Sequence, residues 1–235
     1  MKKQNILEEI SELITEDEII MFQELQIKIK ELNNKTNLTR LIDGDDYWIS
    51  QVFDSIWPFK TFQNINFDNK KFLDIGSGCG FPGLAYSIIH PNSDIYLIDS
   101  SKKKTDALKI LVKEINCKNN IHVINDRIEN LAHQSSMRNT FDIATTRAVS
   151  NPSTVSEYIL PMLKKEGLGV LYCGKWTDKE NKNLDKTLEI LEGKFKEKKK
   201  ISLPSNKGTR NIIQPKNFCP EIYPRKVGKP EKSPL

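Results

Sequence analysis

The first third of the chain carries apolar residues at helical spacing among charged ones. From Ile6 to Leu32 these residues recur with the period of an amphipathic helix. The pattern is interrupted near Thr15 to Asp17, so we predict two helices there. It resumes from Tyr47 to Phe59, where Pro58 is expected to help end a further helix. We expect residues 1–65 to form a helical N-terminal extension that packs on the edge of a core domain.

From Phe72 onward, short apolar runs alternate with helical stretches, which is typical of βα units and a largely parallel sheet. The predicted strands are Lys71 to Ile75, Ile95 to Asp99, Ile121 to Asn125, Phe141 to Thr146 and Gly169 to Cys173. The predicted helices lie near Gly83 to Ile89, Lys103 to Ile115, Thr154 to Leu163 and Asp178 to Leu191. Two later runs, Lys198 to Leu203 and Asn211 to Gln214, predict a terminal antiparallel pair. Residues 66–216 are therefore expected to form an α/β core, with a mostly parallel seven-stranded sheet and helices on both faces.

The C-terminal quarter of the chain is basic. Residues 174–235 contain 16 Lys and Arg against 8 Asp and Glu, a net charge of +8, whereas residues 1–173 carry −3. A polyanionic partner would explain this concentration of charge, and so would a solvated, lysine-rich helix face. Residues 217–235 are basic and rich in proline, which predicts a tail without regular structure.

The remaining composition limits the class of protein. With 37% hydrophobic and 29% charged residues, the chain should fold, and it lacks the run of about 18 apolar residues that a membrane span needs. The N-terminus carries acids where a signal peptide would be apolar, so we expect a cytoplasmic protein. The cysteines lack the spacing of a zinc site or disulfide framework, and no metal is expected. They are Cys79, Cys117, Cys173 and Cys219.

The strongest signal is a glycine-rich segment, Asp74 to Gly83, in which a predicted strand runs into a loop and then a helix. Glycines let the backbone approach a ligand, and a helix N-terminus suits a carboxylate or phosphate. The segment Gly78 to Gly83 satisfies the GxGxxG fingerprint of dinucleotide enzymes. The order Asp-x-Gly-x-Gly-x-Gly from Asp74 favours S-adenosylmethionine instead, because an acid there offsets the positive sulfonium. We therefore expect Asp74, Gly76 and Gly78 to bind this cofactor.

Other candidates follow the remaining predicted strands, at the edge where doubly wound sheets bind ligands. Asp99 is placed to accept both ribose hydroxyls, and Ser100 and Ser101 follow it, with helix capping as their alternative role. Ile128 and Glu129 would cover an adenine face and accept from its amine, although Glu129 alone could be a surface acid. Arg147 could hold the cofactor carboxylate or an RNA phosphate, or form a structural ion pair. The histidines His90, His122 and His133 receive no catalytic role.

Together these segments resemble the bacterial small-subunit (16S) rRNA guanine-N7 methyltransferases, also called the glucose-inhibited division protein B family. The resemblance covers most of the chain, and its most specific parts are the Gly-Phe-Pro-Gly ending of the loop and the basic tail. The matching segments are Asn37-Leu38-Thr39, Phe53-Asp54-Ser55, Asp74 to Gly83, Thr146-Arg147-Ala148, Tyr223-Pro224-Arg225-Lys226-x-Gly228-x-Pro230 and Ser233-Pro234-Leu235.

The resemblance implies a Rossmann-like class I methyltransferase. Its cofactor contacts would come from Gly76, Phe81, Asp99 to Ser101, Ile128, Glu129 and Arg147. Two departures matter. Gln51 stands where the family usually has a histidine, and Cys173-Gly174-Lys175 replaces the common Lys-Gly order, which leaves the role of Lys175 open. Arg147 and Lys175 are positioning candidates, and no catalytic dyad is expected.

The implied reaction is transfer of a methyl group to N7 of a guanine in 16S rRNA, free or in the small subunit, by a protein expected to be a monomer. The N7 lone pair is already nucleophilic, so catalysis would depend on alignment and electrostatics. The residues expected to meet RNA phosphates are Lys198, Lys199, Lys200, Lys207, Arg210, Arg225, Lys226 and Lys229. The alternatives are a methyltransferase for another RNA, a protein or a small molecule, an NAD-dependent oxidoreductase, and a noncatalytic RNA-binding protein.

Overall fold

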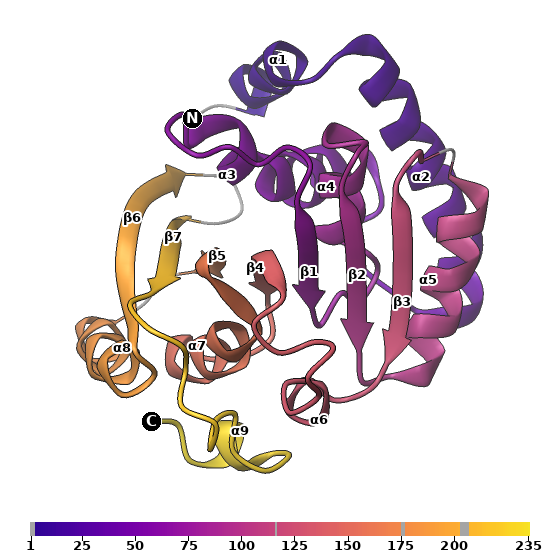
Figure 1. Ribbon diagram of the computed structural model, residues 1–235. Coiled ribbons are helices and arrows are strands. Elements are labelled where there is room, and N and C mark those ends of the chain that lie inside the picture. Colours follow the sequence, from indigo (N-terminus) through magenta and orange to yellow (C-terminus); the bar gives the residue numbers. More distant parts are fainter. Residues whose placement is uncertain (1–2, 116, 175–176, 203–206) are drawn as a thin grey trace.

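The centre of the molecule is a twisted sheet with strand order β3-β2-β1-β4-β5-β7-β6 (Figure 1). This arrangement comes from a computed structural model, which describes residues 3–115, 117–174, 177–202 and 207–235. The strands are β1 (Lys71–Ile75), β2 (Asp94–Asp99), β3 (Asn120–Asn125), β4 (Phe141–Arg147), β5 (Leu163–Cys173), β6 (Gly193–Ser202) and β7 (Lys207–Pro215). Strands β1 to β5 are parallel, and β7 is antiparallel to its neighbours β5 and β6. The predicted seven-stranded sheet and its terminal pair are confirmed.

Parallel pairing brings the carboxyl ends of three strands together. Ile75 at the end of β1 pairs with Ile98 in β2 and with Thr146 in β4. Phe72 to Ile75 are all buried, as expected of a strand that is covered by helices on both faces. The loops that follow these strands therefore meet at one edge of the sheet, where the predicted site residues lie.

The N-terminal helices are α1 (Lys3–Leu13) and α2 (Glu16–Thr36). The predicted break between them is confirmed. Thr15 caps α2, because its hydroxyl accepts the Glu18 N–H at 3.2 Å and the Glu18 carboxylate accepts the Thr15 N–H at 2.7 Å. This reciprocal cap fixes the start of α2.

A π-helix, η1 (Asp46–Phe53), runs directly into α3 (Asp54–Thr61). The prediction that Pro58 helps end this helix is wrong, because Pro58 lies inside α3 and its carbonyl accepts the Phe62 N–H. A proline removes its own N–H donor but can still accept at its carbonyl, so the helix continues for another turn.

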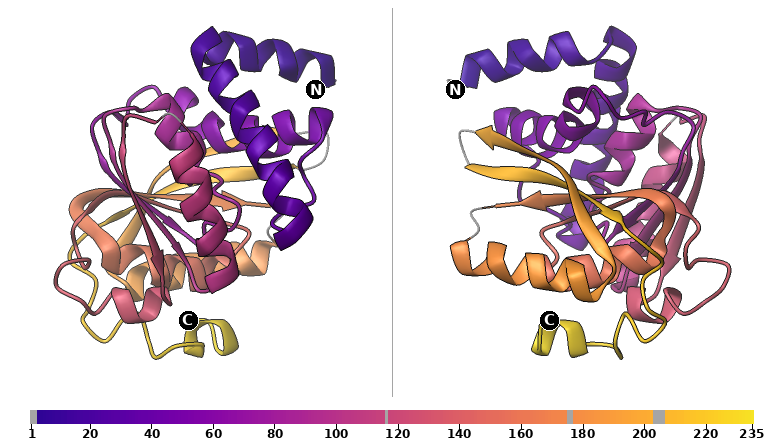
Figure 2. Two further views of the ribbon diagram at one scale, coloured as in Figure 1. Left: turned by 90° about the vertical axis from the view of Figure 1, so that its right-hand side faces the viewer. Right: turned by 60° about the vertical axis from the view of Figure 1, so that its left-hand side comes forward.

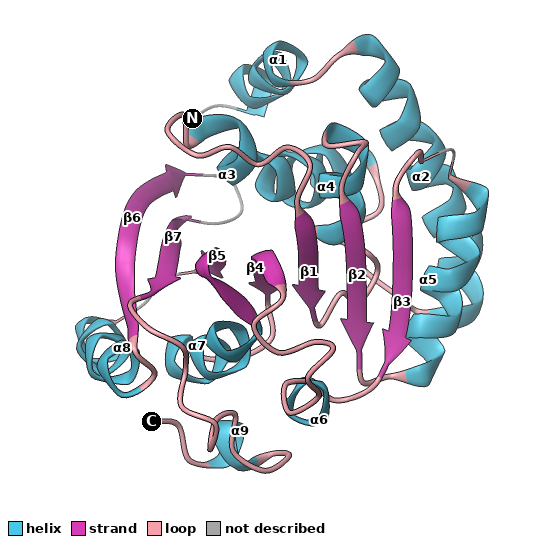
Figure 3. Ribbon diagram, in the orientation of Figure 1, coloured by secondary structure: helices cyan, strands magenta, loops and turns pink. Residues whose placement is uncertain are grey.

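Helices cover both faces of the sheet (Figures 2 and 3). On one face, α4 (Gly83–Ile89) and α5 (Lys102–Glu114) pack on the sheet, and α2 and α3 pack outside them in one continuous hydrophobic cluster. On the other face lie α7 (Pro152–Ile159), the 3-10 turn η2 (Leu160–Met162) and α8 (Asp178–Ile190) over a second cluster. A short helix that was not predicted, α6 (Ile128–Leu131), follows β3. The N-terminal helices thus share one hydrophobic core with the face of the sheet that α4 and α5 cover.

The C-terminal segment differs from its prediction. It contains a short helix, α9 (Lys229–Lys232), and it is tied to the body of the protein along its length. The Arg138 guanidinium donates to the carbonyls of four residues, at 2.7–3.1 Å. One acceptor is Ala132, and the other three belong to the C-terminal segment, namely Cys219, Pro220 and Tyr223. Proline prevents a long helix here, but side chains of the core satisfy the backbone instead. Within the described residues, no helix is long and apolar enough to cross a membrane.

Candidate cofactor and methyl-transfer site

The glycine loop after β1 turns sharply at the edge of the sheet. Gly76, Gly78 and Gly80 have φ values of +75°, +57° and +101°, a region that side-chain-bearing residues rarely adopt. The N–H groups of Gly76 and Ser77 donate to the Ile98 carbonyl at 2.8 and 2.9 Å, which ties the loop to β2. A Cβ at Gly78 would meet only the Gly76 carbonyl oxygen within 4 Å, so this part of the loop faces open space. The loop leaves room for a ligand against its backbone.

Asp74 supports this loop from below. Its side chain is fully buried, and its two carboxylate oxygens accept the Gly83 N–H and the Thr145 hydroxyl, both at 3.0 Å. Burial raises the pKa of Asp74 to about 6, against the lowering effect of these hydrogen bonds. Two cavities lie at this edge, and Asp74 lines neither of them. The structure therefore does not place Asp74 where the predicted direct contact with the cofactor would occur. Its carboxylate instead binds Gly83 at the start of α4 and Thr145 in β4.

A small cavity of about 60 Å³ lies at the ends of β1, β2 and β3. Its lining residues are Ile75, Gly76, Ile98, Asp99, Ser100, Asp126, Arg127, Ile128, Glu129, Val149, Tyr158 and Glu231. Four of these are carboxylates and one is an arginine. Hydroxyls and amines can donate to such a wall, whereas a pyrophosphate or a ribose phosphate would be repelled. We call this space the nucleoside cavity.

Asp99 is the best-placed acceptor in the nucleoside cavity. It is 7% exposed, and its two oxygens accept the N–H groups of Gly78 at 3.0 Å and Ser101 at 2.8 Å. These bonds fix the carboxylate while each oxygen keeps a further lone pair. Ser100 lies in the cavity wall as predicted. Ser101 does not, because it precedes α5 as its N-cap residue.

Ile128 and Glu129 begin α6 and lie in the same wall, as predicted. Glu129 is 3% exposed, and its Oε1 accepts the Gly228 N–H at 3.0 Å and the Tyr158 hydroxyl at 3.3 Å. The alternative of a surface acid is therefore wrong. Burial and the nearby Glu129 carboxylate raise the pKa of Tyr158, which keeps its hydroxyl a donor.

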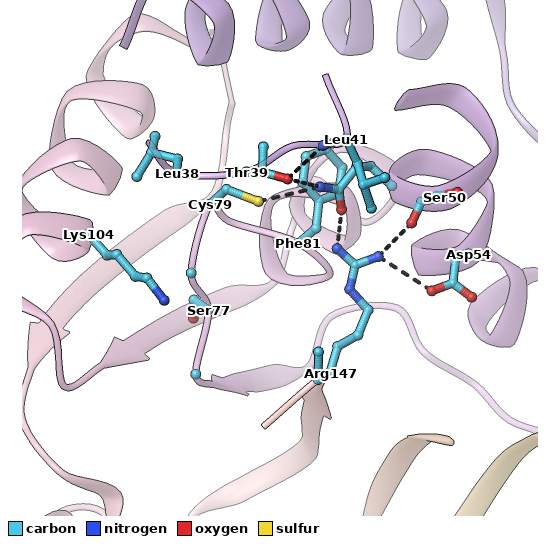
Figure 4. A pocket seen from close by; sticks show the side chains of 14 residues that line it. Leu38, Thr39, Leu41, Ser50, Asp54, Ser77, Cys79, Phe81, Lys104 and Arg147 are labelled. Atoms are coloured by element: carbon cyan, nitrogen blue, oxygen red, sulfur yellow. Dashed lines mark hydrogen bonds and ion pairs between the residues drawn. The ribbon is translucent and has the colours of Figure 1, made fainter. Parts of the chain in front are cut away.

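A larger cavity, of about 520 Å³, meets the nucleoside cavity at Gly76. Figure 4 shows its walls, which come from the loop between α2 and η1, from η1, from the glycine loop and from the end of β4. Its lining residues are Leu38, Thr39, Leu41, Ser50, Gln51, Asp54, Gly76, Ser77, Gly78, Cys79, Phe81, Lys104, Arg147 and Ala148. We call this space the transfer cavity. The predicted contacts Gly76, Gly78, Phe81 and Arg147 are all among them.

Arg147 is the centre of the transfer cavity wall (Figure 4). Its Nη1 donates to the Ser50 carbonyl at 2.9 Å and lies 3.4 Å from the Asp54 carboxylate, and its Nη2 donates to the Gln51 side chain. Gln51 in turn donates to the Thr39 hydroxyl at 3.0 Å. Arg147 therefore joins β4 to the N-terminal helices. The structural ion pair that was the alternative role for Arg147 is therefore present, and the residue also lines the cavity.

Asp54 links this cluster to β7. One of its oxygens pairs with Arg147 and the other with Arg210, which is 1% exposed and lies over the Tyr172 ring. The prediction that Arg210 contacts RNA phosphates is therefore wrong, because its guanidinium is enclosed between Asp54 and the sheet. No role was predicted for Gln51 or Asp54. Asp54 occurs in a segment that carries the family resemblance, whereas Gln51 marks a departure from it, and these were the available signals.

The predicted RNA-binding residues fall into two groups on different parts of the molecule (Figure 1). Lys198 and Lys200 are exposed on β6, but Lys199 donates to the Thr61 carbonyl and lies over the Phe62 ring, so it is a structural contact. The Arg225 guanidinium forms a bidentate ion pair with the buried Glu157, at 2.9 and 2.6 Å, which corrects its expected role.

Lys226 is exposed just before α9, and Lys229 is exposed at the first residue of α9. Lys175 and the side chain of Lys207 lie outside the described residues. Within the described part of the chain, no cluster of His, Cys, Asp or Glu could hold a metal ion.

The two cavities fit S-adenosylmethionine. Asp99, Ile128 and Glu129 would hold its nucleoside, and the loop at Gly76 and Gly78 would lie along the part that carries the sulfonium. The acidic wall of the nucleoside cavity disfavours a dinucleotide. With the parallel sheet and its antiparallel β7, this site defines a Rossmann-like class I S-adenosylmethionine-dependent methyltransferase.

Comparison with known proteins identifies the family. Residues 18–213 match the sequence profile of GidB, described as rRNA small subunit methyltransferase G, and the chain belongs to this family. It is 88% identical, over 237 aligned positions that cover 100% of both chains, to "Ribosomal RNA small subunit methyltransferase G" of Prochlorococcus marinus strain MIT 9312.

Solved structures share the fold at low sequence identity. An S-adenosylmethionine-dependent methyltransferase from Aquifex aeolicus superposes with a TM-score of 0.51 at 15% identity, covering 80% of this chain and 98% of the other. Aeropyrum pernix fibrillarin, solved with natively bound S-adenosyl-L-methionine, gives a TM-score of 0.50 at 15% identity over 62% of this chain and 66% of its own. Both are consistent with the assigned class of fold.

Proposed function

We propose that this protein transfers a methyl group from S-adenosylmethionine to N7 of a guanine in the 16S rRNA of the small ribosomal subunit. Membership of a family described by small-subunit rRNA methylation supports the substrate. In this proposal the enzyme works in the cytoplasm as a monomer, without a metal, on free rRNA or on the subunit.

The observation that carries the proposed chemistry is the state of the ionisable groups in the transfer cavity. Among the described residues that line it, no histidine is present and the one carboxylate, Asp54, is paired with two arginines. Burial raises the pKa of the Cys79 thiol, which keeps it protonated. No residue of this wall is free to remove a proton. Guanine N7 needs no such base, because its lone pair is already available.

The chain's own residues would act by position and by charge. When bound, the cofactor supplies an electrophilic methyl group on a positive sulfur. Gly76 and Gly78 would fix one side of that group, while Phe81 and the Arg147 cluster would limit where a base can stand. Such alignment can supply a large part of a rate enhancement without acid–base chemistry. N7 lies on the deep major-groove edge of A-form RNA, so the target guanine must lie in a loop or an opened strand.

The test is methyl transfer itself. The purified protein is incubated with methyl-labelled S-adenosylmethionine and either naked 16S rRNA or small subunits that lack the modification, and digested nucleosides are separated. Label in 7-methylguanosine is the expected result, and the arm that is labelled identifies the form of the substrate. Label in another nucleoside, or binding of the cofactor without rRNA product in either arm, would overturn the proposed substrate.

A further inference from the structure

The C-terminal segment lies against the nucleoside cavity. Its backbone and side chains are bound at three successive points, by α7 or α6 each time. The Arg225 N–H and guanidinium bind Glu157 at 2.6–2.9 Å, the Gly228 N–H binds Glu129, and the Pro230 carbonyl accepts the Thr154 hydroxyl at 2.9 Å. In Figure 1 this segment passes beneath α6 and α7 and forms α9 shortly before the C-terminus.

The Glu129 carboxylate depends on this segment for its orientation. Helix α6 has only four residues, so it provides little rigidity of its own. The contacts that hold the Glu129 side chain come from elsewhere, namely the Gly228 N–H and the Tyr158 hydroxyl. A hydrogen bond to a carboxylate from a fixed N–H restricts which lone pairs remain for a ligand. Gly228 thus sets how Glu129 faces the cavity.

Glu231 adds a second acceptor from the same segment. Its side chain lies in the wall of the nucleoside cavity, and its charge contributes to raising the pKa of Tyr158 across that cavity. Pro230, which precedes it, is buried, so the backbone that carries Glu231 is fixed. The segment therefore contributes a carboxylate of its own as well as orienting another.

We propose that residues 223–231 form a strap that completes the nucleoside end of the cofactor site. Glu231 contacts the nucleoside of S-adenosylmethionine, and Arg225 is a positioning residue that holds the strap through Glu157. On this proposal the basic segment acts first on cofactor affinity, and Arg225 does not act by binding RNA. It requires that the cofactor occupy the cavities described above, and it does not depend on which RNA is methylated.

Glu231→Ala provides the sharpest test, because the side chain is exposed and its loss should leave the fold intact. Calorimetric titration with S-adenosylhomocysteine should show a dissociation constant raised by roughly three- to tenfold, the size expected for the net loss of one hydrogen bond at an exposed side chain. Glu231→Gln, which keeps an acceptor, should recover part of the affinity. Glu221→Ala is the matched control, since Glu221 is an exposed glutamate of the same segment outside both cavities.

Arg225→Ala tests whether the ion pair between Arg225 and Glu157 holds the strap in place. It should weaken binding of the same ligand by about tenfold, with Arg225→Lys in between and Lys232→Ala unchanged. In steady-state assays the KM for S-adenosylmethionine should rise while the KM for RNA stays constant in Glu231→Ala. Equal affinities of Glu231→Ala and Glu221→Ala would overturn the strap. Because the titrations contain no RNA, a failure of the proposed substrate cannot be mistaken for a failure of the strap.

Discussion

At the nucleoside end of the site, the binding groups come from loops directly after β1, β2 and β3, whereas at the transfer end they come from helices far away in the sequence. Asp99 is the last residue of β2, and Glu129 follows the end of β3 by only a few residues. Gln51 and Asp54 reach the transfer cavity from η1 and α3, roughly a hundred residues before Arg147, their partner on β4. Sheet topology thus determines where the groups of the nucleoside end lie, whereas the packing of the N-terminal helices determines where Gln51 and Asp54 lie.

The two ends also differ in charge and in how that charge is compensated. The nucleoside cavity presents several carboxylates toward a ligand, held mostly by backbone N–H groups. In the transfer cavity, Arg147 and Asp54 compensate each other, and Arg210 pairs with Asp54 from behind. Changes at the nucleoside end should therefore act on cofactor affinity, and changes at the transfer end on stability and rate.

The largest expected effect is at the transfer end, from Asp54→Ala. It would leave the buried Arg210 without a counter-charge, which typically costs about 3–5 kcal/mol of unfolding free energy. Urea unfolding measures this loss. Asp106→Ala is the control, because Asp106 forms an exposed pair with Lys102 and should cost less than about 1 kcal/mol. Similar losses in the two variants would show that the Asp54 cluster does not hold the N-terminal helices.

A second prediction concerns Asp74, which lies beneath the loop that both ends share. Its pKa of about 6 in the folded protein exceeds the value of 3.8 expected without burial, so the folded state binds the proton more tightly. This tighter proton binding contributes about 3 kcal/mol to the free energy of unfolding. The contribution is fully present below about pH 4 and is lost as the pH rises through 6. Compared with Asp74→Asn, the wild type should gain stability as the pH falls from 7 to 4. Parallel stability curves for the two proteins would contradict the assignment.

At the nucleoside end, Asp99→Ala should lower the affinity for S-adenosylhomocysteine by roughly a hundredfold, or about 2.7 kcal/mol. The substitution removes the expected ribose acceptor and also frees the N–H groups of Gly78 and Ser101. Calorimetry gives the dissociation constant, and a thermal melt shows whether the fold persists. An affinity within threefold of the wild type would mean that the nucleoside does not lie against Asp99.

The same contrast explains what the sequence could predict. Strand positions follow from short apolar runs, and β1 and α4 have the predicted bounds, Lys71–Ile75 and Gly83–Ile89. Residues at or just after strand ends could be placed at this edge by topology alone, and Asp99 and Ile128 do line the nucleoside cavity there; their contact with the cofactor stays a prediction. Local rules were enough wherever neighbouring residues in the chain are neighbours in space.

Residues whose surroundings depend on distant packing could not be assigned in this way. Arg210 and Arg225 look like surface cations in a basic segment, and only the fold reveals that Asp54 and Glu157 neutralise them. Asp74 was assigned to the cofactor from its motif, but its carboxylate faces Gly83. Net charge and motif spacing report which groups are present, not which way they point. The three-part division of the chain, with boundaries near residues 65 and 216, stays a prediction.

Arg147→Lys should reduce kcat roughly tenfold with a smaller change in cofactor affinity. A single ammonium cannot reach the Ser50 carbonyl, Gln51 and Asp54 at once, so the transfer cavity would lose its shape while the nucleoside cavity keeps its own. Arg40→Lys, an exposed change outside both cavities, serves as the control. If the affinity fell as far as kcat, the two ends would not be separable.

The smallest expected effect is on RNA binding, and it tells which end of the site the RNA backbone follows. Lys198 and Lys200 lie on β6, next to the strand that carries Arg210, whose partner Asp54 lines the transfer cavity. Lys226 and Lys229 lie on the strap. We expect the paired alanine change at Lys198 and Lys200 to lower the slope of log affinity against log salt by about 1 to 2.

The same change at Lys226 and Lys229 should lower that slope less, because those lysines stand beside the nucleoside cavity, away from the place where a guanine must enter. Fluorescence anisotropy with a labelled rRNA fragment over a series of salt concentrations measures both slopes. A larger effect at Lys226 and Lys229 would move the RNA path to the strap. Then one segment would hold the cofactor with Glu231 and the RNA with its lysines, and the separation of roles between the two ends would be lost.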